Sequence, residues 1–101
     1  MTELNSQNFT ECLHTRFEVH DGTDATMPLE LVAVNVQNFS RRVDNFSLVF
    51  RGQPSPWLPQ CIYRVKHERL GEFNLFLVPI GPDSQGMQYE AVFNRLVDGS
   101  R

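Results

Sequence analysis

Cysteine is scarce in this 101-residue chain, and its scarcity excludes two classes of protein. Only two cysteines occur, Cys12 and Cys61, and they share no CxxC spacing. They are too few for the disulfide framework of a small secreted domain, and too far apart for a local zinc knuckle. We expect both to be small buried hydrophobic residues. A disulfide between them stays open, because spacing alone does not give its geometry.

Long apolar runs and a signal-like start are also missing. No window approaches the roughly 20 apolar residues that a membrane-spanning helix needs. The first residues lack a basic stretch followed by an apolar one, so no secretory signal is predicted. We expect a protein that is cytoplasmic as synthesised, with no membrane partner, whatever assembled particle it later joins.

The usual spacings of metal-binding and catalytic residues are absent as well. His14, His20 and His67 form no HxH or HxxxH pair, as a zinc site would favour. No GxSxG elbow occurs, and a strand carrying both Cys61 and His67 would hold them about 20 Å apart. Carboxylates that could pair occupy polar positions of alternating segments, at Glu18, Glu30, Glu72 and Glu90. We therefore predict no enzyme, and no catalytic, cofactor-binding or metal-binding residues.

Positive charge is in short supply. The chain has 9 basic and 12 acidic residues, a formal net charge of −3, which does not suit a nucleic-acid backbone. Only Arg51 beside Phe50 and Arg64 beside Tyr63 approach the mixture of basic and aromatic residues that single-stranded nucleic acids bind. We expect no nucleic-acid partner.

The chain does contain segments in which apolar and polar residues alternate with a period of two residues. Alternating apolar and polar residues are typical of β-strands, and they cover 16–20, 28–36, 46–51, 61–67, 72–78 and 87–94. The parity of the second segment switches near Leu31–Val32, which predicts a bulge or a strand covered on both faces. We expect Asn8 to cap a short helix, and this helix to lie across an open end of the sheet. We expect a polar connection at 37–44 and loops at 53–60 and 81–86. We expect the fifth strand to end at Pro79.

Six short strands joined by turns leave no room for βαβ crossovers. The sequence therefore predicts one all-β domain over residues 1–101, with an ordered core at about 8–96. We expect a six-stranded antiparallel sandwich or partly open barrel with a short N-terminal helix.

An ordered series of motifs resembles a known family. The motifs are PLELV at 28–32, FSLVFRG at 46–52, LPQ at 58–60, Tyr63, His67, LG at 70–71, LFLVPIGP at 75–82 and YEAVFN at 89–94. They are similar to an uncharacterised family of bacterial and phage proteins of about 90 residues, the size of one small domain, catalogued only as a domain of unknown function. The resemblance implies no activity. It implies neighbours that are tail-collar or tail-fibre-like proteins, and so a place in an assembled particle.

Two features favour an interaction role. Trp57 lies between prolines in a stiff segment, where a large ring is either a partner anchor presented at little entropic cost or a lid on the core. Apolar residues also occupy positions that should face outward, more than one copy can bury. The interface candidates are Trp57, Phe76, Val78, Val49 and Ile62, with Val92 also outward, and Arg51 and Arg64 as directional polar contacts.

The sequence thus favours a non-enzymatic structural protein that associates with itself or docks into a larger assembly, tail-like or filamentous. The alternative is a monomeric ligand- or glycan-binding module that uses the 52–60 and 81–86 loops, with an aromatic platform of Trp57 and Tyr89.

Overall fold

A computed structural model describes residues 4–22, 25–37 and 43–96 of the chain. Within them lie one short helix and six strands. The elements are α1 (Ser6–Thr10), β1 (Arg16–His20), β2 (Thr26–Val36), β3 (Val43–Gly52), β4 (Cys61–His67), β5 (Gly71–Asp83) and β6 (Gly86–Leu96). Residues 38–42 of the expected polar connection lie outside the described residues. No helix in these ranges is long and apolar enough to cross a membrane.

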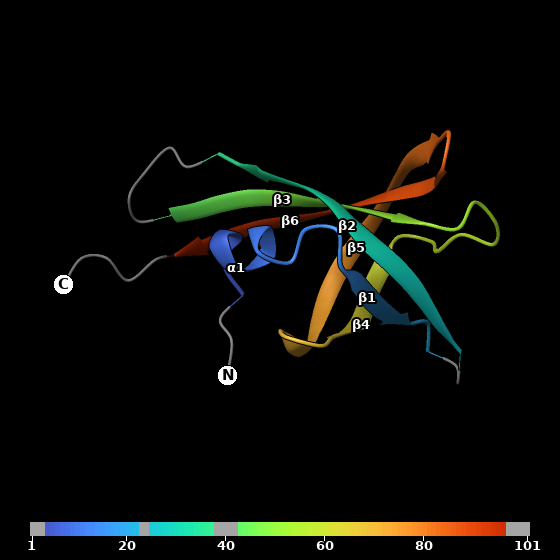
Figure 1. Ribbon diagram of the computed structural model, residues 1–101, viewed down its shortest axis with the longest axis horizontal. Helices are drawn as coiled ribbons and strands as arrows, with labels where there is room; N and C mark the ends of the chain where they lie inside the picture. The colour runs from blue at the N-terminus through green and yellow to red at the C-terminus, as the bar shows by residue number, and fades with distance from the viewer. Residues whose placement is uncertain (1–3, 23–24, 38–42, 97–101) are drawn as a thin grey trace.

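The strands form one closed antiparallel barrel in the order β1-β2-β3-β6-β5-β4 (Figure 1). The predicted all-β, six-stranded antiparallel fold with a short N-terminal helix is confirmed, and of the two arrangements expected the sheet forms the barrel. Closure depends on two long strands that change partners. The first half of β2 pairs with β1 and its second half with β3. Likewise β5 pairs first with β4 and then with β6.

Each of these two strands contains one irregularity. The register of β2 shifts between Leu31 and Ala33, so the bulge predicted from the parity switch is confirmed. The register of β5 shifts between Pro79 and Gly81. The predicted strand end at Pro79 is wrong, because β5 continues to Asp83. Residues 78–83 pair only with β6 among the described strands, and a proline is tolerated where one side of a strand has no ladder partner.

The predicted loop at 81–86 is a tight hairpin turn. Asp83 pairs with Gly86, and its Oδ1 accepts hydrogen bonds from the Gln85 and Gly86 amides at 2.8 and 3.0 Å. Gly86 has a φ of 154°, and a Cβ there would lie 2.0 Å from the Gly52 carbonyl oxygen. The turn therefore requires glycine at position 86.

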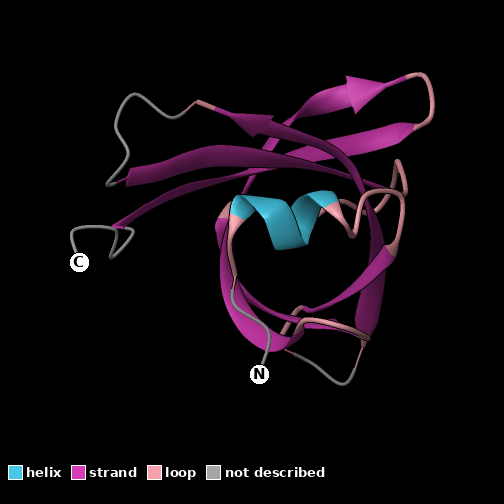
Figure 2. Cartoon of the chain, turned by 60° about the vertical axis from the view of Figure 1, so that its left-hand side comes forward, coloured by secondary structure: helices cyan, strands magenta, loops and turns pink. Residues whose placement is uncertain are grey.

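The helix α1 lies across one end of the barrel (Figure 2). Its cap is Asn5, whose side chain accepts from the Asn8 amide at 2.8 Å, so the prediction of Asn8 as the cap is wrong by three residues. Asp44 of β3 fixes the same end, since its carboxylate accepts from the Ser6 amide and hydroxyl at 3.1 and 2.9 Å. These bonds hold the fully buried Phe9 over the barrel.

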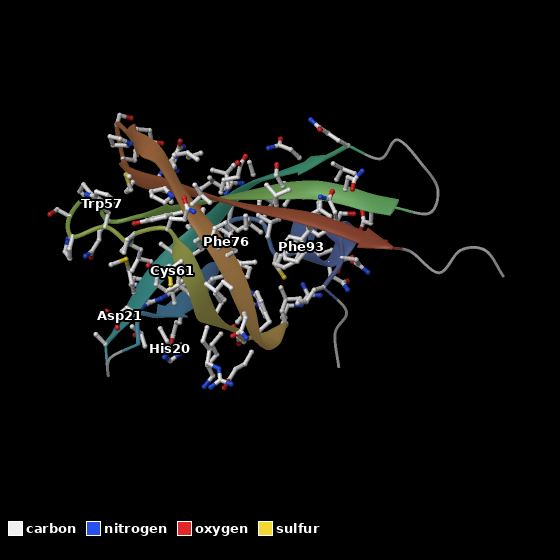
Figure 3. All side chains as sticks on the ribbon, turned by 180° about the vertical axis from the view of Figure 1, so that it is seen from behind. His20, Asp21, Trp57, Cys61, Phe76 and Phe93 are labelled. Carbon is white, nitrogen blue, oxygen red and sulfur yellow. The ribbon has the colours of Figure 1, made fainter. Side chains whose placement is uncertain are left out.

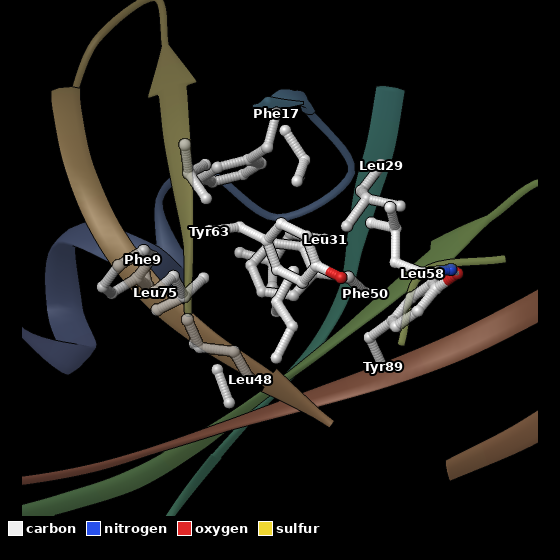
Figure 4. Close-up of a cluster of buried hydrophobic side chains, with 14 of the residues drawn as sticks. Phe9, Phe17, Leu29, Leu31, Leu48, Phe50, Leu58, Tyr63, Leu75 and Tyr89 are labelled. Atoms are coloured by element: carbon white, nitrogen blue, oxygen red, sulfur yellow. Dashed lines mark hydrogen bonds between the residues drawn. The ribbon is translucent and has the colours of Figure 1, made fainter. Parts of the chain in front are cut away.

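The interior is rich in aromatic rings (Figure 4). Phe9 lies within 5.4–6.3 Å, ring centre to ring centre, of four other phenylalanines, Phe17, Phe46, Phe73 and Phe93. Further along the barrel Tyr63 and Tyr89 are also buried. Aromatic pairs at such separations stabilise a core beyond the area they bury.

Candidate functional site

Two large apolar side chains face outward side by side on β4 and β5. Tyr63 and Val65 point inward, so alternation places Ile62 on the outer surface. Phe76 is turned outward in the same way, and it is the direct cross-strand partner of Ile62. The exposed fractions are 65% for Ile62 and 49% for Phe76. We call these two side chains the outer pair; Phe76 is visible in Figure 3.

The other expected valines continue the outer surface across β6. Val49 and Val78 both pair with Glu90 of β6, from its two sides. Both valines are half-buried, whereas Val92, two residues along β6, is 65% exposed. The outer surface is therefore apolar at the outer pair and Val92, with a carboxylate at Glu90.

The two arginines expected to make directional contacts differ in how strongly they are bound within their own chain. Arg51 donates from Nε and Nη2 to Asp83 Oδ2 at 2.9 and 2.6 Å. These bonds, with the backbone amides of the turn, lower the pKa of the Asp83 carboxyl. Arg51 is thus engaged within its own chain. Arg64 is exposed and makes a longer ion pair, 3.5 Å from Nε to Glu72 Oε2.

The proline-rich segment presents Trp57 to solvent. Its neighbour Leu58 is buried, and the Leu58 amide donates to the Tyr89 hydroxyl at 2.8 Å. The Tyr63 hydroxyl donates to the Pro59 carbonyl at 2.5 Å. Leu58 is therefore the residue that covers the core, and Trp57 remains 52% exposed. The predicted aromatic platform of Trp57 and Tyr89 is wrong for Tyr89, because this side chain is fully buried.

The cysteines are unlike each other. Cys12 is buried and Cys61 exposed, and both are free thiols, so the expectation of two buried cysteines is wrong for Cys61. Burial raises the pKa of the Cys12 thiol. Cys61 shares the lining of a depression of about 470 Å³ with His20 and Asp21 (Figure 3). This grouping depends on the pairing of β1 with β4, which no local sequence pattern indicates.

The buried His67 has a structural role. Its Nδ1 accepts from the Arg69 and Leu70 amides at 3.0 and 3.2 Å, so the proton is on Nε2, which donates to the Thr15 hydroxyl at 2.8 Å. Burial and the nearby Arg69 lower the pKa of His67. His67 therefore fixes the turn that leads into β5 through these two backbone amides.

Two further depressions are lined by polar residues. One, of about 310 Å³, lies along the outer surface of β2, β3 and β6 and is lined mainly by amides, Ser47 and Glu90. The other, of about 540 Å³, is lined by His67 and by charged side chains of β1, β4 and β5. Within the described ranges, no three His, Cys, Asp or Glu residues are grouped so that they could hold a metal ion.

Comparison with known proteins gives a family and no activity. No curated protein matches the chain, and no solved structure matches it. A family match covers residues 4–93, nearly the whole chain. The chain belongs to the family described as "Domain of unknown function (DUF6916)".

Proposed function

We propose that this protein is a non-enzymatic structural protein that works by associating with itself or by docking into a larger assembly. The observation that carries the proposal is the outer pair, in which Ile62 and Phe76 face solvent side by side on adjacent strands. The proposed assembly is tail-like or filamentous, and its further partner is a tail-collar or fibre-like protein of the kind that the sequence resemblance implies.

Free energy favours covering such a pair. Burying an exposed Ile or Phe side chain contributes ~1.5–3 kcal/mol, and contiguous exposed apolar side chains often mark interaction sites. The polar border is suited to direct the contact, because Arg64 and Glu72 lie on the same two strands with more than half and about half of their side chains exposed. Charges at the rim of an interface set orientation more than affinity.

The test is the mass in solution of an Ile62→Ser, Phe76→Ser variant. We expect the wild-type chain to show a mass that rises with concentration in size-exclusion chromatography with light scattering, and the variant to lose at least tenfold in association constant. The matched control is Lys66→Ser, an exposed outward position of β4 four residues from Ile62. Equal association in the variant and in the wild type would refute the role of the outer pair.

The alternative function, a ligand- or glycan-binding module, is favoured by one observation. Trp57 is half-exposed in a segment that Leu58 and Pro59 tie to the core, and the 81–86 turn is joined to β3 nearby through Arg51 and Asp83. Trp57 is the only tryptophan, so its fluorescence reports on this segment alone. A response to added glycans that is independent of protein concentration would favour the module over association.

A further inference from the structure

The barrel is extended at one end by part of three strands. Residues 33–36 of β2 pair with 46–49 of β3, and residues 43–48 of β3 pair with 91–96 of β6. Neither β1 nor β5 pairs with these parts of β2 and β6. Figures 1 and 2 show these strands running past α1, away from the rest of the barrel. We call this part the three-strand extension. Among the described strands it is not closed, so it has two open edges, one on β2 and one on β6.

The open edges of this protein are not equally protected. The open side of β5 at residues 78–83 carries Pro79 and Pro82, and prolines on an edge prevent the addition of another strand. The edge of β2 reads VAVNV over residues 32–36, without proline or charge. Such β-branched, uncharged edges are suited to pair with another strand.

The hydrogen-bonding pattern shows which groups of β2 are open. The Gln37 amide donates to the Asn45 carbonyl at 2.8 Å, so alternation turns the N–H and C=O groups of Val34 and Val36 away from β3. On that same side, Leu31 is still occupied, since its amide donates to Thr15 and its carbonyl accepts from His14. Beyond Leu31, no described residue is paired with this edge of β2.

The side chain at the end of the edge supports the same conclusion. Val36 pairs with the buried Phe46 and lies on the α1 side of the sheet, yet it is 49% exposed. A strand added along β2 would place its own side chains beside Val36 and cover it. The edge therefore offers both backbone groups and an apolar contact.

We propose that the β2 edge of one copy pairs with the β2 edge of a second copy, in antiparallel orientation around a two-fold axis. This inference rests on the proposed function and names one surface for it. A two-fold contact uses the same surface on both copies, and the uncharged VAVNV segment contains nothing that repels its own copy. The two three-strand extensions then form one continuous sheet of six strands, and the outer pair stays available for a second contact.

A proline at position 36 tests the pairing. Val36→Pro removes an outward N–H while leaving the β2–β3 bonds of the neighbouring residues in place, and Val36→Thr is the matched control that keeps the amide. We expect Val36→Pro to weaken dimerisation at least tenfold in light scattering and Val36→Thr to weaken it less than threefold. Far-ultraviolet circular dichroism and Trp57 fluorescence establish that both variants are folded.

Hydrogen exchange of the wild-type chain is a second measurement that needs no variant. We expect the Val34 and Val36 amides to exchange at least tenfold more slowly at high protein concentration than at low concentration. Concentration-independent exchange of these two amides would overturn the β2 pairing even where the variants are uninformative.

The outcomes separate this inference from the proposed function. If Val36→Pro associates like the wild type while the Ile62→Ser, Phe76→Ser variant does not, the β2 pairing is overturned and the proposed function stands. If the wild-type chain is a monomer at every concentration, both self-association and the β2 pairing are overturned.

Discussion

At the scale of single residues, polar side chains inside or beside the barrel serve its architecture. His67 accepts two backbone amides and donates to Thr15, whose hydroxyl in turn donates to the Cys12 carbonyl at 2.6 Å. This chain of bonds joins the β4–β5 turn to the segment that follows α1. It needs a neutral imidazole, because protonation of Nδ1 would remove the acceptor of both amides.

The lowered pKa of His67 predicts how stability depends on pH. A pKa that is lower in the folded than in the unfolded chain stabilises the fold above the ordinary histidine value of about 6.5, and the contribution is lost as pH falls below it. We expect the free energy of unfolding, measured with urea, to decrease from pH 7 to pH 5. His67→Asn should remove most of this slope, whereas His20→Asn, at a half-buried position of β1, should keep it. An unchanged slope in His67→Asn would contradict the assignment.

The two cysteines predict two different thiol reactivities. Cys61 is exposed and Cys12 is buried with a raised pKa, and the thiolate is the reactive form. We expect one thiol per chain to react quickly with a disulfide reagent in the native protein and two in urea. Cys61→Ser should abolish the fast reaction; a fast thiol that survives in that variant would place Cys12 in contact with solvent.

At the scale of elements, a helix of five residues completes a six-stranded barrel. It is too short to be stable by itself, and it is held by Asp44 at its first turn and by Phe9 in the aromatic core. Without the helix, the phenylalanines at this end would face water. The helix is therefore part of the core rather than an appendage.

Truncation of Phe9 tests this role of the helix. Phe9→Ala removes a fully buried ring, and such substitutions cost about 3–5 kcal/mol of unfolding free energy. Gln7→Ala on the exposed side of the same helix is the control, and it should change stability by less than about 0.5 kcal/mol. Both values come from urea unfolding followed by circular dichroism. A small loss in Phe9→Ala would mean that the barrel end is closed without the helix.

Some features of the strands could be predicted from the sequence, and others depend on partners elsewhere in the barrel. Alternation located the strands and the Leu31 bulge, because parity is a local signal. The end of β5 was missed, because Pro79 is accommodated by an unpaired side of the strand, which depends on the partners of the whole barrel. The grouping of Cys61 with His20 and the engagement of Arg51 by Asp83 were missed for the same reason. The exposed state of Ile62 and Phe76, in contrast, followed from alternation alone.

At the scale of the whole molecule, the described part of one copy presents two surfaces that are suited to contact a second copy. One is the outer pair on β4 and β5, and the other is the open edge of β2 on the three-strand extension. They lie on different strands, so one copy could use both at once. Copies joined by both contacts would grow beyond dimers, as a structural component of a larger particle does.

Sedimentation of the unmodified chain over a wide range of concentrations tests the central claim most directly. A single chain has a mass of 11.7 kDa. We predict that the weight-average mass rises reversibly above this value as the concentration increases from the micromolar to the millimolar range. A mass that stays at 11.7 kDa throughout would contradict self-association as the function of this protein.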